Sequence, residues 1–431
     1  MHELSGGFVI DGVYGDEAVQ ALKTILKKGN SLKTIDEKRS ARPLHKVQET
    51  QMVMYNVKKE RLAPLLKWAG GKENELKFIQ PLIPSFDRFF EPFVGGGAVF
   101  FSLQASVSYI NDKSTELMNL YKMIAGNDRA FFKMLETMVH HWERISDVVD
   151  LNPRELLGMY KPFSDNKYTS DKMKDVVLDF VLHHVDEFNG MFESSFNKNI
   201  ENFIREITRN LMNKTSRMKV LESRKGRLSD LDILANIECA LKSAYYMHFR
   251  YLYNHRQELE IPPSHAAAMF FFIRENAYAS MFRYNSQGGF NVPYGGISYN
   301  RKGLKKKLDL MKSSDVRYHF SNTVIENMDF DEFLSKHQPG VADFMFLDPP
   351  YDSDFSTYSQ NEFTKNDHER LAAYLLNKCP SKFMLVIKNT KFISQLYENK
   401  GLNIETFDKK YLVSFQDRND KNAEHLIITN Y

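Results

Sequence analysis

The chain has 431 residues, 42% of them hydrophobic, which is enough for a buried core and for two domains or one domain with a large insertion. Its 58 basic and 55 acidic side chains give a net charge of +3, so the overall charge indicates no particular class of partner. The two cysteines, Cys239 and Cys379, are too few for a disulfide framework or a four-ligand zinc site, and no apolar run approaches the roughly 20 residues that cross a bilayer.

The chain begins with a polar stretch. Residues 1–60 are expected to form a flexible N-terminal extension, in which ALKTILKKGNSLK (21–33) is compatible with a short amphipathic helix. The first twenty residues have neither a basic start nor a long apolar run, which argues against a signal peptide. We therefore expect a soluble, cytoplasmic protein.

Residues 61–125 alternate between strand and helix patterns. A short strand ends at Phe89–Glu91, a turn follows at Gly95–Gly97, and AVFFSLQAS (98–106) predicts a helix. VSYIND (107–112) predicts the next strand. This succession is the beginning of a βαβ unit.

Residues 126–317 have a different character and are predicted to be a helical insertion that contains a target-recognition domain. Apolar residues recur at helical spacing and strand signals are sparse. The segments that show this spacing are FFKMLETMVHHW (131–142), MKDVVLDFVLHHVDEF (173–188), ENFIREITRNLMNK (201–214) and DILANIECALKSAYYMHFRYLYN (232–254).

The α/β pattern resumes over residues 318–431. DFMFLD (343–348) and KFMLVIKN (382–389) predict strands, and a helix is expected from a cap at Asn366–Asp367 to Lys378. KKYLVSF (409–415) and AEHLIITNY (423–431) predict a terminal β-hairpin. The fold expected is therefore a doubly wound, Rossmann-like α/β sheet, split by the helical insertion, with ligands at the carboxyl ends of its strands.

The glycine-rich turn in EPFVGGGAVF (91–100) lets the backbone approach a ligand closely. A GxGxxG fingerprint that begins at Gly95 would need glycine at position 100, which is Phe100, so a pyrophosphate ligand is disfavoured. Glu91 before the turn and Asp112 after the next strand suit an adenosine ligand that carries a positive charge and no phosphates. S-adenosyl-L-methionine fits this description, although a turn that serves packing alone has the same sequence.

The segment LDPPY (347–351) ends a predicted strand with an acid, two prolines and an aromatic residue. The prolines stiffen the loop, so that the Asp348 carboxylate and the Pro349 carbonyl can accept the two hydrogen bonds of an exocyclic amino group. Tyr351 supplies a flat face for stacking a base. Methylation at carbon 5 of cytosine would need a Pro-Cys nucleophile, whereas this chain has only Cys379–Pro380, in the reverse order.

Four segments together resemble the Dam-type, alpha-group N6-adenine DNA methyltransferases: PLLKWAGGK (64–72), EPFVGGGAVFF (91–101), FRYNSQGGFNVPYG (282–295) and LDPPY (347–351). The resemblance implies that S-adenosylmethionine is the cofactor and that Asp348, Pro349, Pro350 and Tyr351 form the catalytic loop. It also implies a set of residues that bind the cofactor. These are Trp68, Lys72, Glu91, Phe93, Gly95, Gly97, Asp112, Asp329, Phe330 and Asp348.

The same resemblance implies a segment that recognises double-stranded DNA. Arg283 corresponds to an arginine that reads guanine, and Tyr278 to a tyrosine beside the gap left by the flipped base. Ala279–Ser280 stand where the family's best-known members have Asn-Gly. The residues expected to contact DNA are Tyr278, Arg283, Asn285, Pro293, Arg301, Lys302 and Lys305.

Two basic stretches are compatible with contacts to DNA phosphates. Residues 298–317 carry seven basic and two acidic side chains, a local charge of +5, and residues 215–227 form a second basic stretch. A run of charge is also typical of a solvated surface, so 215–227 alone is weak evidence.

The sequence thus predicts an enzyme that transfers a methyl group to N6 of a flipped adenine in duplex DNA, in restriction-modification or as a solitary enzyme. A cognate restriction endonuclease would be a partner in the first case, and the protein would act at the nucleoid in both. The alternatives are an N4-cytosine or RNA N6-adenine methyltransferase, and a DNA-binding module without activity.

Overall fold

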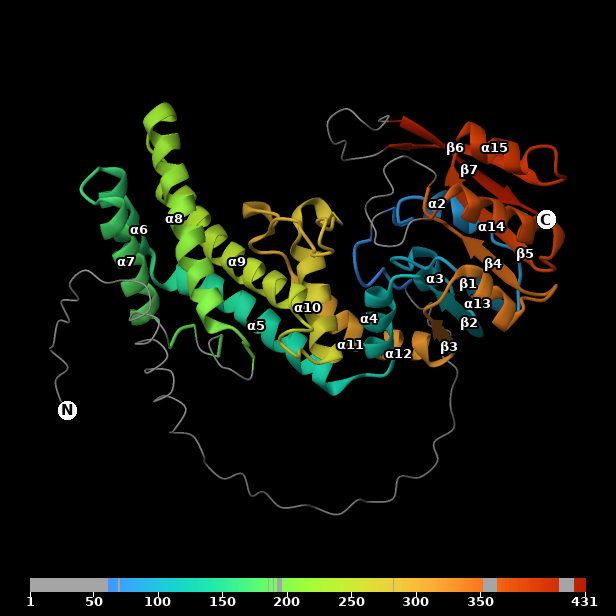
Figure 1. The fold of residues 1–431 in the computed structure, drawn as a ribbon, viewed down its shortest axis with the longest axis horizontal. Coiled ribbons are helices and arrows are strands. Elements are labelled where there is room, and N and C mark those ends of the chain that lie inside the picture. Colours follow the sequence, from blue (N-terminus) through green and yellow to red (C-terminus); the bar gives the residue numbers. More distant parts are fainter. Residues whose placement is uncertain are drawn as a thin grey trace, which may run out of the picture.

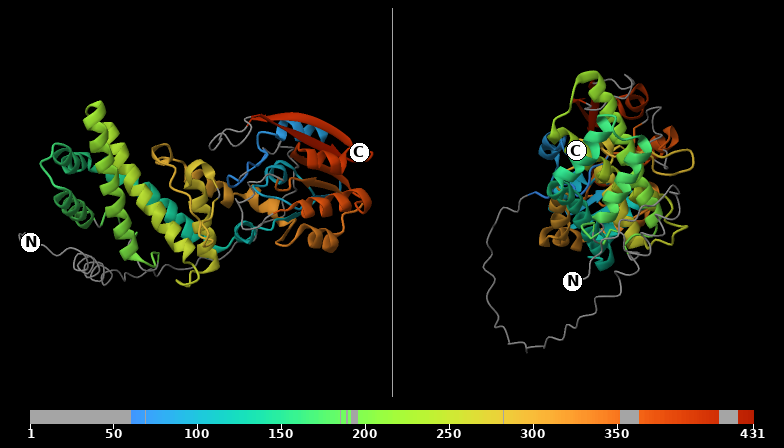
Figure 2. Two further views of the ribbon diagram at one scale, coloured as in Figure 1. Left: turned by 45° about the horizontal axis from the view of Figure 1, so that its top comes forward. Right: turned by 90° about the vertical axis from the view of Figure 1, so that its left-hand side faces the viewer.

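The computed structural model describes residues 61–68, 70–184, 186–188, 190–191, 196–281, 283–351, 363–410 and 422–431. The extension predicted over residues 1–60 lies outside them. In Figure 1 the described residues form an elongated molecule, with a sheet and its helices at one end and a group of long helices at the other. The segment 277–300 lies between these two ends in Figures 1 and 2.

The described strands form one seven-stranded sheet in the order β3-β2-β1-β4-β5-β7-β6. Strands β1 to β5 are parallel, and β7 pairs antiparallel with both β5 and β6. This confirms the predicted Rossmann-like sheet with a C-terminal β-hairpin. The strands are β1 (Arg88–Glu91), β2 (Val107–Asn111), β3 (Thr323–Glu326), β4 (Phe344–Leu347), β5 (Lys382–Lys388), β6 (Asn403–Lys410) and β7 (Asn422–Thr429).

Successive residues of a strand pack on opposite faces of the sheet. Phe89 and Phe344 belong to the core that contains α3 and α4, whereas Phe90 and Met345 belong to a second core with α13, α14 and α15. Because helices cover both faces, the central strands are apolar along their length. The helices around the sheet are α2 (Leu76–Ile79), α3 (Ala98–Ser102), α4 (Thr115–Ala125), α12 (Ser314–Ser321), α13 (Phe330–His337), α14 (Lys365–Asn377) and α15 (Lys391–Tyr397).

Between α4 and α12 the described chain is largely helical, as predicted, apart from the segment between α10 and α11, and its helices extend away from the sheet (Figures 1 and 2). Trp142 lies in the core of this part, where its ring contacts those of Tyr245, Phe272 and Tyr294. No helix among the described residues is long and apolar enough to span a membrane. The helices are α5 (Arg129–Leu151), α6 (Pro153–Ser164), α7 (Ser170–His183), α8 (Ile200–Lys225), α9 (Asp230–Asn254), α10 (Pro263–Asn276) and α11 (Leu304–Lys312).

Several elements differ from their predicted bounds. Helix α14 begins earlier than expected because Thr364, and not Asn366–Asp367, caps it, in a reciprocal capping box with Asp367. Helix α3 ends at Ser102, since Leu103 is already extended. Strand β6 begins at Asn403, ahead of the predicted KKYLVSF strand, of which residues 411–415 lie outside the described residues. Strand β3 was not predicted, because it is short and all four of its residues are only half-buried.

The packing of Trp142 gives a stability prediction. We expect Trp142→Ala to lower the free energy of unfolding by about 3–5 kcal/mol, because a fully buried indole leaves a cavity among aromatic neighbours. Urea unfolding followed by circular dichroism measures the loss. Leu151→Ala, on the same helix but with a residue that is 66% exposed, is the control and should change the free energy by less than about 0.5 kcal/mol. Equal effects of the two substitutions would contradict this packing.

Candidate active site

The loop that follows β4 carries an ion pair at the edge of the sheet. Lys72 is 2% exposed and pairs with Asp348, which is 19% exposed. The Lys72 ammonium also donates to the Tyr351 hydroxyl over 3.1 Å and to the Gly70 carbonyl over 3.1 Å. Burial of a lysine is costly unless its charge is compensated, so Asp348 and these acceptors explain its position. The ammonium lies 5.4 Å from the centroid of the Tyr351 ring.

The two prolines of this loop differ in exposure. Pro349 is buried and Pro350 is exposed, while the ring of Tyr351 packs 5.4 Å from that of His425 on β7. The terminal hairpin therefore packs against the loop through the contact between His425 and Tyr351.

The glycine-rich turn after β1 is shaped around Trp68. Gly95 and Gly97 have positive φ angles of 47° and 69°, a conformation that favours glycine. A Cβ atom at Gly95 would lie 2.9 Å from the Trp68 indole, and one at Gly96 would lie 2.9 Å from the Trp68 Cβ. The Tyr121 hydroxyl donates to the Gly95 carbonyl over 2.8 Å. The turn thus needs glycine for its backbone conformation and for its contact with the indole.

Two carboxyl groups, the buried Glu91 and the half-buried Asp112, hold the turn. Glu91, 2% exposed, accepts a hydrogen bond of 3.0 Å from the Phe100 N–H. The Asp112 carboxylate accepts from the Gly95 N–H over 3.0 Å and from the Ser114 N–H over 2.9 Å. Burial raises the pKa of both groups, and for Glu91, where the pKa is raised well above its usual value, the nearby charge of Asp348 adds to the effect.

Asn111, at the end of β2, joins the loops after β1 and β3. Its side-chain amide donates to the carbonyls of Pro92 and Met328 over 3.0 and 3.1 Å, and its oxygen accepts from the Met328 N–H over 3.0 Å. The Asn327 amide donates to the Asp112 carbonyl over 2.8 Å. These bonds hold the start of α13 beside Asp112.

Asp329 caps α13 and pairs with Arg370 at 2.7 Å. Phe330 follows it, with its ring centroid 5.5 Å from that of Phe93 and 5.8 Å from that of Phe363. The three aromatic rings form a cluster at the same edge of the sheet as Asp112.

The sequence-predicted cofactor and catalytic residues therefore come together at the carboxyl ends of β1 to β4. Sequence reasoning missed Phe363, Arg370 and His425, which belong to no recognisable motif. It also missed Arg274 of α10, which lies just before the recognition segment (residues 277–296). Arg274 gives no signal of its own, since its partner Trp68 is far away in the sequence.

Arg274 and Glu275 connect the end of α10 to the loop that carries Trp68. The Arg274 guanidinium is 1% exposed, lies 4.7 Å from the Trp68 ring and donates to the Lys67 carbonyl over 3.2 Å. Burial lowers the pKa of Arg274 to about 9. Glu275, fully buried, accepts from the Lys67 N–H over 3.1 Å. The recognition segment, which begins directly after α10, is thus anchored beside the glycine-rich turn.

The recognition segment folds back on itself through isolated bridges between Ala277 and Tyr294 and between Tyr284 and Phe290. Helix α9 holds it from below. The Tyr246 hydroxyl and the Arg250 guanidinium both donate to the Val292 carbonyl, over 2.9 and 2.8 Å. The Asn254 side chain accepts from the Phe290 N–H over 2.9 Å and donates to the Phe290 carbonyl over 3.1 Å.

Four residues of this segment were predicted to contact DNA. Tyr278 is 46% exposed, and Arg283 and Pro293 are exposed as well. The Arg283 guanidinium donates to the Asn291 carbonyl over 3.2 Å. The Asn285 side-chain oxygen accepts from the N–H groups of Gln287 and Gly289, so it shapes the turn.

Much of the basic stretch 298–317 is balanced by acids. Arg301 lies 2.7 Å from Asp150 and 3.2 Å from Glu238. Lys302 and Lys307 lie 3.1 and 2.8 Å from Glu275. Lys305 is exposed and makes no ion pair with a described residue.

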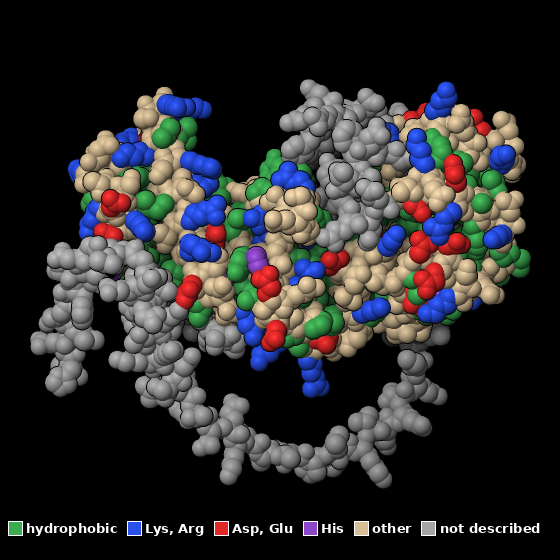
Figure 3. All heavy atoms as spheres, viewed as in Figure 1, with side chains coloured by type: hydrophobic (Ala, Val, Ile, Leu, Met, Phe, Trp, Pro, Cys, Tyr) green, Lys and Arg blue, Asp and Glu red, His purple; other side chains and the backbone are tan. Residues whose placement is uncertain are grey.

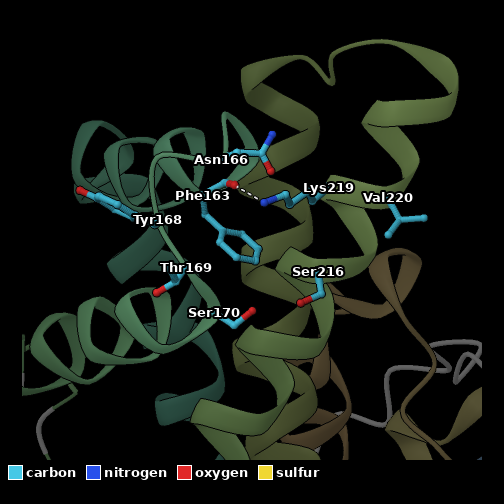
Figure 4. Close-up of a pocket in the computed structure, with 8 residues that line it drawn as sticks. All are labelled: Phe163, Asn166, Tyr168, Thr169, Ser170, Ser216, Lys219 and Val220. Atoms are coloured by element: carbon cyan, nitrogen blue, oxygen red, sulfur yellow. Dashed lines mark hydrogen bonds between the residues drawn. The ribbon is translucent and has the colours of Figure 1, made fainter. Parts of the chain in front are cut away.

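A shallow pocket of about 400 Å³ lies at the opposite end of the molecule, between α8 and the α6–α7 turn (Figure 4). Of its lining residues only Lys219 is charged, and its ammonium already donates to the Phe163 carbonyl over 2.7 Å and lies 4.3 Å from the Phe163 ring. The lining shows no group of converging polar side chains that would indicate a second active site.

The chain is similar to one protein family and to several proteins with known names. A family model described as D12 class N6 adenine-specific DNA methyltransferase matches residues 68–240 and 232–413. The chain is 24% identical to the type II methyltransferase M.CviBI of Paramecium bursaria Chlorella virus NC1A over 383 residues, which are 86% of this chain and 100% of that protein. It is 25% identical to the type II methyltransferase M.MjaIII of Methanocaldococcus jannaschii over 392 residues, 85% and 99% of the two chains. It is 23% identical to the retron Ec67 DNA adenine methylase of Escherichia coli over 343 residues, 78% and 81% of the two chains.

The raised pKa of Glu91 predicts how stability depends on pH. Above its ordinary pKa of 4.5, Glu91 ionises in the unfolded chain but keeps its proton in the folded protein until the pH passes the raised value. The wild type should therefore lose stability relative to Glu91→Gln as pH rises, by up to about 1.4 kcal/mol per pH unit within that window. Urea unfolding of both proteins at several pH values between about 4 and 9 measures the difference. Parallel stability curves would contradict the prediction.

Proposed function

Because the chain belongs to the D12 class of N6 adenine-specific DNA methyltransferases, we propose that the carboxyl edge of its sheet binds S-adenosylmethionine and transfers the methyl group to N6 of an adenine extruded from duplex DNA. The observation that carries this proposal is that the segment 64–72 joins two motifs far apart in sequence: its Trp68 packs against the glycine-rich turn, and its Lys72 contacts Asp348 and Tyr351 of the DPPY loop.

The residues at this edge fit S-adenosylmethionine. The turn from Gly95 to Gly97 carries no side chain, so a ligand could approach its backbone closely. Burial raises the pKa of Glu91 and Asp112, and a cationic ligand bound beside them would favour their ionised forms. The cluster of Phe93, Phe330 and Phe363 offers an aromatic environment for an adenine ring.

In this proposal Asp112 would take the ribose hydroxyls, Asp329 would lie at the adenine, and the turn with Trp68 would hold the methionine end. When bound, the cofactor supplies a methyl group made electrophilic by its sulfonium.

The target amine is activated by the DPPY loop. The amino group of adenine is a poor nucleophile because its lone pair is delocalised into the ring. Asp348 and the Pro349 carbonyl would accept its two protons in hydrogen bonds and draw the nitrogen toward tetrahedral geometry. The Lys72 ammonium favours the ionised carboxylate of Asp348, which is the form that accepts. Tyr351 would stack on the base, which leaves the helix at a cost of a few kcal/mol.

The names of the similar proteins suggest two biological settings. Two are type II methyltransferases, and one is a DNA adenine methylase of a retron. We propose that this protein modifies chromosomal DNA in the cytoplasm, at the nucleoid, either beside a cognate restriction endonuclease or alone. N4-cytosine and RNA methylation are disfavoured by the description of the matching family.

The role of Asp348 is tested by methyl transfer from tritiated S-adenosylmethionine to unmethylated genomic DNA. We expect Asp348→Ala to reduce incorporation by roughly a hundredfold or more, because the amine loses its main hydrogen-bond acceptor. Asp309→Ala, which removes an exposed acid of α11, serves as the matched control and should retain wild-type incorporation.

Mass spectrometry of the nucleosides identifies the product. N6-methyldeoxyadenosine is expected. N4-methyldeoxycytidine as sole product, or no incorporation by the wild type on varied genomic DNA, would remove the proposal.

Recognition through Arg283 gives a further prediction. An exposed arginine on the recognition segment suits a bidentate contact to guanine O6 and N7, so Arg283→Ala should relax sequence preference at one position at a cost of about 1–3 kcal/mol. Single-molecule sequencing of DNA from a host that expresses the wild type or the variant reports the methylated motif. An unchanged motif with Arg283→Ala would show that this side chain does not read a base.

A further inference from the structure

We propose that helix α8 is a second DNA-binding surface, which contacts the phosphates of duplex DNA outside the recognised sequence. The inference rests on the proposed function, because it assumes that duplex DNA lies on the recognition segment. It concerns the long helices α5 to α9, which contribute no residue to the active site proposed at the edge of the sheet.

The exposed side of α8 is a row of arginines. Arg205, Arg209, Arg217 and Arg224 are all exposed, and with 3.6 residues per turn they fall on about one third of the helix circumference. Residues that pack against the neighbouring helices, such as Phe203 and Leu211, lie on the other side.

The charge of this row is largely available to a ligand. Among the described residues Arg217 and Arg224 make no ion pair, whereas Arg205 donates to the neutral Asn202 side chain. Arg209 pairs with Glu206 at 3.3 Å but is itself 62% exposed. This contrasts with the stretch 298–317, where Arg301, Lys302 and Lys307 are bound to acids.

Helix stability does not explain the row. Basic residues in the last turn interact favourably with the helix dipole, which accounts for Arg224 and Lys225. Arg205, Arg209 and Arg217 lie outside that turn, and like charges four residues apart, as at 205 and 209, destabilise a helix. A polyanion along the helix would turn this repulsion into attraction.

The row faces the side on which DNA is expected. In Figure 3 the surface is hollowed between α8 and the segment 277–296, and Lys and Arg side chains gather along α8 on the side of this hollow. The exposed Arg283 and Tyr278 belong to the segment on the other side of the hollow.

The row is held in a fixed position relative to the recognition segment. Helix α9, which anchors that segment through Tyr246 and Arg250, is bonded to α8. Asn202 of α8 bonds His248 of α9 at 2.8 Å, and Ser243 of α9 donates to Asn210 of α8 over 2.8 Å. From Arg205 to Arg224 the helix rises about 28 Å, which corresponds to roughly eight base pairs.

The test compares binding to two duplexes that share one adenine-containing central sequence, one of about 12 and one of about 35 base pairs, because only the longer one can reach α8. Fluorescence anisotropy measures both dissociation constants at several salt concentrations. The wild type should bind the long duplex more tightly. In Arg217→Gln/Arg224→Gln, affinity for the long duplex should fall by about 30-fold at roughly 0.15 M salt, and the log–log salt slope should become shallower by about 1.8, since two phosphate contacts are lost.

The control is Lys172→Gln/Lys174→Gln, which removes the same charge from exposed positions of α7, on the side of α8 away from the hollow (Figure 1). It should bind both duplexes as the wild type does. Circular dichroism checks that both variants are folded. Equal affinity of the wild type for the two duplexes, or unchanged binding by the arginine variant, would overturn the proposal. These results are also the ones expected if α8 binds an acidic protein and not DNA.

Methyl transfer by the wild type to the same duplexes separates this inference from the proposed function. Length-dependent binding without any transfer would reject the enzymatic proposal and support the surface. Transfer with no dependence of binding on duplex length would do the reverse.

Discussion

The parallel pairing of β1 with β4 is the constraint on which the site depends. Phe89 lies opposite Phe344 and Phe90 opposite Met345, so the glycine-rich turn and the DPPY loop emerge side by side. Charge fixes this register at the start of both strands, where the Arg88 guanidinium bonds both oxygens of the buried Asp343 carboxylate. A slip of one residue would exchange the two faces of β4 and shift Asp348 along the edge by about 3.3 Å. The Lys72–Asp348 pair closes the same junction at the other end of the strands.

The edge of the sheet is an unfavourable place for negative charge. Glu91, Asp112 and Asp348 lie near the buried Lys72, and burial raises the pKa of Glu91 and Asp112, which makes their ionised forms unfavourable. Such an arrangement costs stability in the free protein, and a cationic ligand relieves it. Destabilised carboxylates at a functional edge are therefore physically consistent with a sulfonium donor, whereas a phosphate ligand would add to the repulsion.

Local sequence patterns predict the elements in which apolar residues recur regularly. The strands β4 and β5 are apolar runs, and α5, α8 and α9 have apolar residues at helical spacing on the side that packs against neighbouring helices. Strand β3 lies at the edge of the sheet and is only half-buried, so its sequence has no strong apolar pattern that predicts a strand. The motifs predict Asp348 and Gly95, but Arg274 stacks on Trp68 only because α10 ends beside that loop. Partnerships of this kind arise from tertiary packing, and no local window contains both members.

The same distinction governs charge. Counted along the sequence, residues 298–317 form a strongly basic stretch. In the folded protein Lys302 and Lys307 neutralise Glu275, which is fully buried and also accepts from the Lys67 N–H. Although burial acts to raise it, the pKa of Glu275 is lowered because the two lysines stabilise its charge. These lysines therefore join the recognition segment to the loop of Trp68, and charge held in this way is not available to a phosphate. On α8, by contrast, Arg217 and Arg224 make no ion pair with a described residue, so their charge is available to the DNA phosphates in the surface that we propose.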